Sequence, residues 1–174
     1  MHLFLHGEKN IGKSTAIRKV LEILSAYQPV ALSGFFTWNG GKEDPHVYLR
    51  PAGPGDSGEV CRVASWNEET RILTCDTMAF DRDGVQTLEN RQNAQLIIMD
   101  ELGFLEKDAM LFRQAVMDTI AGDVPIIGVL RMGDVPWHDD IKRSPNVEII
   151  DVDKKNRDTL PQELANRLKA VIWS

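Results

Sequence analysis

Runs of apolar residues and their spacing predict strands and helices in alternation along the chain. An apolar run from Leu3 to His6 predicts a first strand, and residues 13–27 carry apolar side chains at helical spacing. An unbroken apolar run at 96–99, of the kind found in strands buried on both faces, predicts a further strand, and strands are also expected at 30–38, before the turn signal at 39–41, and at 125–130 and 147–152. Further helices are expected at 106–121, with Met110 on the inner side, and from about 159, where Pro161 falls in the first turn.

The hydrophobic pattern changes in residues 42–80, where the apolar segments become short and closely spaced. Short β-prone segments begin near Val47, Val60 and Arg71, and turn signals at 51–55 and 67–69 separate them. This pattern predicts a small antiparallel meander inserted into the fold.

Strands that alternate with helices predict an α/β fold with a mostly parallel sheet and helices on both faces. The length of 174 residues is that of one domain, so we expect residues 1–174 to form a single domain with the β-rich insertion at about 42–80.

Composition narrows the function classes. The apolar fraction of 43% and the charged fraction of 26% are those of a soluble globular protein. A net charge of −6 without a basic block argues against a nucleic-acid partner and against a membrane-surface role. No apolar run approaches bilayer length, the start lacks a signal peptide, and Cys61 and Cys75 are isolated. We expect a cytoplasmic protein with reduced thiols.

One motif carries most of the functional information. Residues 7–14 match the pattern G-x-x-x-x-G-K-[S/T] between an expected strand and an expected helix, which is the context of a phosphate-binding P-loop. Gly7 and Gly12 permit the tight turn, Lys13 reaches the β- and γ-phosphates, and the Ser14 hydroxyl ligates Mg²⁺. The expected nucleotide-binding residues of this segment are Gly7, Glu8, Lys9, Asn10, Ile11, Gly12, Lys13, Ser14 and Thr15.

Two carboxylates follow the buried run at 96–99. In a P-loop protein, the acid that ends such a strand contacts Mg²⁺ or its bound water, and we assign that role to Asp100. Glu101, the next residue, is placed to deprotonate a water for attack on the γ-phosphorus. The alternative for Glu101 is a solvated acid that caps the following helix.

Other candidates rest on position alone. Arg131 follows the strand at 125–130, where it could neutralise charge on the γ-phosphate or pair with Asp134 at the surface. Thr37 and Asn39 could contact substrate or water, or form a turn.

The remaining polar candidates have structural explanations. His6 is expected to pack against the P-loop, and residues 136–140 are expected to form an exposed loop rather than a metal site. Four arginines of the insertion are expected to be solvated, with a lid as the alternative: Arg50, Arg62, Arg71 and Arg82.

Four stretches together resemble a known family, the small P-loop nucleoside-triphosphatases related to the cancer-related nucleoside-triphosphatase. They are Gly7–Ser14, Gly34-Phe35-Phe36-Thr37, the segment Asp100 to Glu106, and Asn156-Arg157-Asp158-Thr159-Leu160-Pro161. The resemblance implies a P-loop fold of the additional-strand, catalytic-glutamate type. It also implies slow Mg²⁺-dependent hydrolysis of ATP, GTP and other nucleoside triphosphates. It places Asn156 and Arg157 beside the base or ribose, although the same residues could cap the last helix.

The sequence thus predicts an enzyme that hydrolyses nucleoside triphosphates to diphosphate and phosphate, with Mg²⁺ as cofactor. Two alternatives stay open. One is a P-loop nucleotide or small-molecule kinase, although the strand at 30–38 is followed by no acid before Glu43. The other is a slow nucleotide-dependent switch that acts through an unidentified protein partner.

Overall fold

The computed structural model of the chain describes residues 1–53, 60–89 and 91–174. The described strands form one sheet in the order β5-β4-β3-β2-β6-β7-β1-β8. Their bounds are β1 His2–His6, β2 Leu32–Asn39, β3 His46–Pro51, β4 Cys61–Asn67, β5 Ile72–Cys75, β6 Leu96–Leu102, β7 Ile126–Leu130 and β8 Val147–Asp151.

Five neighbouring strands of this sheet are parallel. The pairs β2–β6, β6–β7, β1–β7 and β1–β8 are all parallel. The carboxyl ends of β1, β2, β6 and β7 therefore lie side by side at the same end of the strands. Strands β6 and β7 are apolar along nearly their whole length because helices cover both of their faces. In open α/β sheets, ligands bind just beyond the carboxyl ends of the parallel strands.

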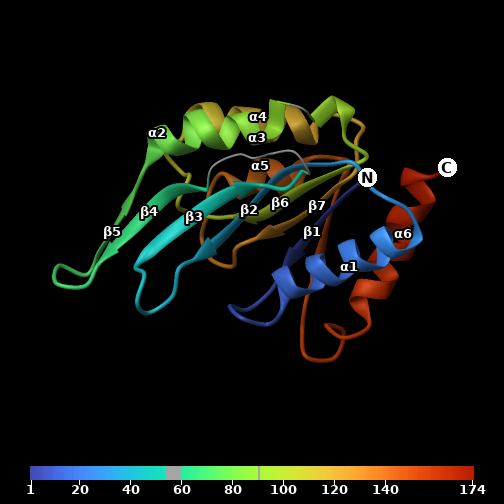
Figure 1. Cartoon of the computed structure of the whole chain (residues 1–174), viewed down its shortest axis with the longest axis horizontal. Coiled ribbons are helices and arrows are strands. Elements are labelled where there is room, and N and C mark those ends of the chain that lie inside the picture. The colour runs from blue at the N-terminus through green and yellow to red at the C-terminus, as the bar shows by residue number, and fades with distance from the viewer. Residues whose placement is uncertain (54–59, 90) are drawn as a thin grey trace.

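Helices lie on both faces of the sheet, as Figure 1 shows. On one face α1 (Lys13–Tyr27) and α6 (Leu160–Ile172) bury a core that includes Ile17, Leu24 and Leu164. On the other face α4 (Met110–Ile120) and a helical run before β6 bury a second core around Phe35, Phe80 and Phe112. The elements on this second face are α2 (Thr77–Ala79), the π-helical η1 (Phe80–Gly84), α3 (Val85–Glu89) and α5 (His138–Arg143).

The β-rich stretch between 42 and 80 forms the antiparallel strands β3, β4 and β5. They do not fold as a separate unit, because β3 pairs with β2 and the three strands extend the main sheet at one edge (Figure 1). Part of the turn expected at 51–55 lies outside the described residues.

Several expected boundaries match closely and others do not. Helix α1 occupies the expected residues 13–27, and the strands at 126–130 and 147–151 agree with their apolar runs. The helix expected from 106 begins only at Met110, whose side chain is exposed rather than buried. The helices at 77–89 had no sequence prediction. Within the described ranges, none of the helices has the length and hydropathy that a bilayer span requires.

Candidate active site

The turn between β1 and α1 has a backbone conformation that requires glycine at two positions. Gly7 has φ 146°, and a Cβ at this position would lie 2.5 Å from the carbonyl oxygen of Val152. Gly12, with φ 114°, occupies the position before α1, and no side chain caps the helix. The N–H groups of the first helical turn are therefore available to an anion, which the helix dipole also favours.

Lys13 is folded onto its own loop. Its side-chain nitrogen donates to the carbonyl oxygens of Gly7, at 2.8 Å, and Glu8, at 2.7 Å, and the residue is only 8% exposed. Burial lowers the pKa of Lys13, while the nearby charges of Glu101 and Asp100 act in the opposite direction. The amine thus lies above the loop at a point where a phosphate oxygen can replace the two carbonyls.

Ser14 and Asp100 face each other across the start of α1 and the end of β6. The Ser14 hydroxyl donates to Asp100 Oδ1 at 2.9 Å, and Asp100 is 2% exposed. Burial raises the pKa of Asp100 to about 6, while the hydrogen bond from Ser14 opposes the rise. Neighbouring ligands of an octahedral Mg²⁺ at about 2.1 Å lie about 3 Å apart, so the two oxygens have the spacing and the chemistry that Mg²⁺ requires.

The end of β6 is irregular where its two carboxylates occur. The pairing of β6 with β7 shifts between Met99 and Leu102, so Asp100 and Glu101 have no regular partner on β7, although Asp100 still pairs with Phe36 of β2. The backbone N–H of Glu101 instead donates to the Thr37 hydroxyl at 3.0 Å. Irregularities of this kind redirect side chains, and both carboxylates line the cavity above the P-loop.

Glu101 has a cationic partner in the residue that follows β7. Arg131 Nη1 lies 3.3 Å from Glu101 Oε1, and each side chain is 34% exposed. The guanidinium also lies 4.5 Å above the ring of Phe104. Of the two sequence alternatives, the surface pair with Asp134 is wrong, because Arg131 turns inward to Glu101.

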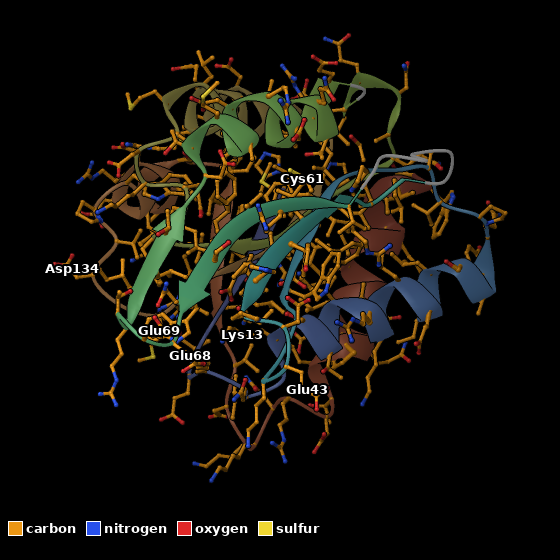
Figure 2. All side chains as sticks on the ribbon, turned by 60° about the vertical axis from the view of Figure 1, so that its left-hand side comes forward. Lys13, Glu43, Cys61, Glu68, Glu69 and Asp134 are labelled. Carbon is orange, nitrogen blue, oxygen red and sulfur yellow. The ribbon has the colours of Figure 1, made fainter. Side chains whose placement is uncertain are left out.

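These groups share one cavity of about 540 Å³. Among the expected residues, it is lined by Gly7, Lys9, Asn10, Gly12, Lys13, Ser14, Thr15, Thr37, Asn39, Asp100, Glu101 and Arg131. Figure 2 shows Lys13 at the end of the molecule that also carries the turns of Glu43 and Glu68–Glu69, whereas Cys61 lies away from it. Glu8 contributes its backbone carbonyl to Lys13, and Ile11 packs into the core against α1 and α6.

The cavity also has walls that sequence reasoning missed: Arg18, Trp38, Val47, Leu105 and Met132. Arg18 follows Ser14 by one helical turn, and this spacing could have placed it on the cavity face of α1. The others had no such signal, because they reach the cavity through the β2–β3 pairing and through the segments that follow β6 and β7.

Asn156 and Arg157 lie in the loop between β8 and α6, outside the walls of this cavity. The Asn156 side chain accepts from the N–H of Asp153 at 2.9 Å and donates to the carbonyl of Asp151 at 2.8 Å. It makes no hydrogen bond that caps α6, so the capping alternative is wrong for its side chain. The loop follows Val152, whose carbonyl lies against Gly7, and therefore adjoins the P-loop.

Residues 136–140 are only in part the exposed loop that the sequence predicted, since Pro136, Asp139 and Asp140 are exposed but the two residues between them are not. Trp137 is 4% exposed and His138 is 1% exposed, and α5 begins at His138. Both side chains bury ring surface behind β7, and burial lowers the pKa of His138 to about 4.

Other candidates stand apart from the cavity. His6 is half-buried and contacts Asp151 at 3.0 Å, and both cysteines are free thiols. Arg50 lies over Phe36, and Arg82 pairs with Asp83, so neither reaches across the cavity as a lid. Its walls likewise include neither Arg62 nor Arg71.

Comparison with known proteins agrees with this geometry. A family model described as NTPase matches residues 2–165, which is most of the chain. The chain belongs to the NTPase family. The enzyme is 26% identical over 170 residues to nucleoside-triphosphatase THEP1 of Methanosarcina acetivorans, an alignment that covers 96% of each chain. It is also 26% identical over 181 residues to the cancer-related nucleoside-triphosphatase of Homo sapiens, with 91% of this chain and 92% of the human protein covered.

Solved structures show that this NTPase has the expected fold. The crystal structure of THEP1 from Aquifex aeolicus superposes with a TM-score of 0.78 at 22% identity and covers 97% of this chain and 99% of that one. The solution structure of the human cancer-related enzyme gives 0.76 at 22% identity. The α/β P-loop NTPase fold and the family resemblance expected from the four sequence stretches are both confirmed.

Proposed function

We propose that the enzyme hydrolyses the β–γ phosphoanhydride bond of nucleoside triphosphates in a Mg²⁺-dependent reaction, with Glu101 as the general base. The observation that carries the proposal is the position of Glu101. Its carboxylate lies in the same cavity as the P-loop, one residue after Asp100 and opposite Arg131. The names of the relatives, which call them nucleoside-triphosphatases, support the substrate class.

The P-loop binds the phosphates in this proposal. Backbone N–H groups at the start of α1 donate to the β- and γ-phosphate oxygens, and Lys13 exchanges the carbonyls of Gly7 and Glu8 for a phosphate oxygen. A charged oxygen is the stronger acceptor for an ammonium group, so the exchange is favourable when the triphosphate enters. Asn156 and Arg157, in the loop beside Gly7, are proposed to contact the base or ribose.

Ser14 and Asp100 are the residues that would hold Mg²⁺, since their oxygens have suitable spacing. The ion neutralises charge on the phosphate oxygens when it is bound. The Ser14 hydroxyl would direct a lone pair to the ion, and its O–H can still donate to Asp100, since a hydroxyl has one donor and two acceptor positions.

Glu101 and Arg131 supply the hydrolytic step. In the ligand-free cavity the two side chains neutralise each other at 3.3 Å. The γ-phosphate competes for the guanidinium, and as Arg131 turns to it the carboxylate is released to accept a proton from water. The water oxygen bonds to the γ-phosphorus, and the bond between the γ-phosphorus and the β–γ bridging oxygen breaks. The products, nucleoside diphosphate and phosphate, then leave.

The experiment is phosphate release from ATP, GTP, CTP and UTP with Mg²⁺ and no acceptor. The variants are Glu101→Gln and, as a matched control, Glu22→Gln on the exposed side of α1. We expect release from several triphosphates, a loss of roughly 10²–10⁴-fold in Glu101→Gln, and no change in Glu22→Gln. Unchanged turnover in Glu101→Gln would refute the assignment of the base.

A second candidate is transfer of the γ-phosphate to a small acceptor. It is favoured by one observation: Trp38, Val47 and Leu105 give the cavity that contains Glu101 apolar walls. Such walls suit the ring of an acceptor as well as the base of the nucleotide. Phosphate release that requires an added hydroxyl compound would favour this candidate over hydrolysis.

A further inference from the structure

A buried carboxyl group lies behind the site and takes no part in the proposed chemistry. Glu106 is 2% exposed, and its Oε1 accepts the backbone N–H of Gly103. Burial raises the pKa of Glu106 to about 7, while backbone hydrogen bonds from Gly103 and from Glu106 itself act in the opposite direction. Burial of a carboxyl group destabilises the folded state unless a hydrogen bond compensates for the water that is lost, and here that bond is the one to Gly103.

Gly103 is fixed from two sides. Its N–H is held by Glu106, and its carbonyl accepts the indole N–H of Trp137 at 2.9 Å. Both side chains are buried. The carbonyl of Leu102, which shares a peptide group with the Gly103 N–H, accepts the N–H of Arg131 at 2.8 Å and ties the segment to the end of β7.

The same segment is the support of Arg131. A Cβ added to Gly103 would meet the Arg131 side chain at 3.0 Å, so the alkyl part of the arginine runs directly over this glycine. Its guanidinium then lies 4.5 Å above Phe104 and 3.3 Å from Glu101. A displacement of Gly103 therefore moves the support of the arginine and, two residues away, the backbone of the glutamate.

We propose that Glu106 is a positioning residue, whose bond to Gly103 holds Glu101 and Arg131 in register with the γ-phosphate. The inference rests on the proposed function, since it is that function which requires both groups at one phosphate. Displacement of reacting groups by about 1 Å can reduce a rate about 10²-fold. Loss of the bond between Glu106 and Gly103, two residues from Glu101, can therefore lower turnover. Among the described residues, the hydrogen bonds that Gly103 makes with side chains go to Glu106 and Trp137 and not to the P-loop, so we expect nucleotide affinity to change little when the bond to Glu106 is lost.

The test compares Glu106→Gln with Glu106→Leu. Glutamine keeps an acceptor oxygen for the Gly103 N–H, whereas leucine has a similar volume and no acceptor. At pH 7.5 we expect kcat of Glu106→Gln to stay within about 3-fold of the wild type and kcat of Glu106→Leu to fall about 30–100-fold. The Kd of a non-hydrolysable ATP analogue should change less than about 3-fold in both.

Thr119→Val is the control for loss of a buried hydrogen bond elsewhere. Thr119 is 2% exposed, and its hydroxyl donates to Ala115 at the far end of α4. This variant should lose thermal stability and keep the wild-type kcat. Trp137→Phe removes the hydrogen bond from the indole N–H to the Gly103 carbonyl and keeps an aromatic ring. It should lower kcat about 5–10-fold and leave Kd unchanged. It also tests the proposal if Glu106→Leu does not fold.

Three results would overturn the inference. They are wild-type kcat in folded Glu106→Leu, equal loss in Glu106→Gln and Glu106→Leu, and wild-type kcat in Trp137→Phe. Glu101→Gln is measured alongside and distinguishes the two proposals. Retained turnover in that variant rejects Glu101 as the base, whatever Glu106 does.

Discussion

The two halves of the cavity are built in different ways. The P-loop half, residues 7–15, is one continuous turn whose shape depends on Gly7 and Gly12 and on the start of α1. The β6–β7 half, Asp100, Glu101 and Arg131, joins the ends of two strands and is supported by buried side chains from further along the chain. In our proposal binding is therefore encoded locally, while the chemistry depends on tertiary packing, and substitutions should separate the two.

Loss of Lys13 should give the largest effect on binding. Lys13→Ala removes the side chain that meets the β- and γ-phosphates in our proposal and leaves the phosphate charge without its partner. We expect the Kd of a non-hydrolysable ATP analogue to rise roughly 10²–10³-fold, because removal of one member of a desolvated charge pair costs about 2–5 kcal/mol. Lys19→Ala, at an exposed position of α1 outside the cavity walls, is the control, and calorimetry reports both. An equal Kd for Lys13→Ala and wild type would show that the P-loop half does not bind phosphate.

Arg131→Ala should affect turnover rather than binding. It removes the proposed donor to the γ-phosphate, a change that in comparable sites costs roughly 10²-fold or more in kcat. Arg131→Lys keeps the charge but not the forked geometry over Phe104 and should recover only part of the rate. Steady-state phosphate release checks both variants. A kcat for Arg131→Ala that equals the wild type, or exceeds it, would mean that the pair with Glu101 only restrains the base.

Glu106 should make the stability of the β6–β7 half depend on pH. Its pKa is about 7 in the folded chain and about 4.5 ordinarily, so the folded state favours the protonated carboxyl. That stabilisation is complete below about pH 4.5 and is lost as the pH rises to about 7, by at most about 3 kcal/mol at about 1.4 kcal/mol per unit.

Glu106→Gln does not titrate, so its free energy of unfolding should increase relative to the wild type between pH 5 and pH 8. Urea denaturation at the two pH values measures the difference. The exposed Glu22→Gln should show a constant difference. A constant difference for Glu106→Gln as well would indicate that the carboxyl titrates normally in the folded chain.

Thr37 should have the smallest effect of the four. Thr37→Val preserves shape but removes the oxygen that accepts the Glu101 N–H at 3.0 Å. An unpaired N–H costs about 1–3 kcal/mol, and part of this appears as a drop in kcat of about 5-fold. Thr37→Ser keeps the hydroxyl and should behave like the wild type. If valine and serine give the same kcat, this bond does not position Glu101.

The same contrast explains what the sequence could predict. The P-loop, α1 and the two acids near the end of β6 follow from local pattern, since glycine turns, helical spacing and apolar runs each act over a few residues. The partner of Glu101 could not be predicted, because Arg131 meets it across the β6–β7 pairing, 30 residues away. Burial of Glu106, Trp137 and His138 depends on packing behind the strands, and the exposed residues on either side, Pro136, Asp139 and Asp140, concealed the burial of the two rings.

The separation of binding from chemistry is tested most directly on Glu101→Gln alone. Single-turnover phosphate release and the Kd of a non-hydrolysable ATP analogue, each with Mg²⁺, would be measured on the same preparation. The account predicts a Kd within about 3-fold of the wild type and a rate reduced by roughly 10²-fold or more. A rate that stays at the wild-type value, or a Kd that rises as steeply as the rate falls, would contradict it.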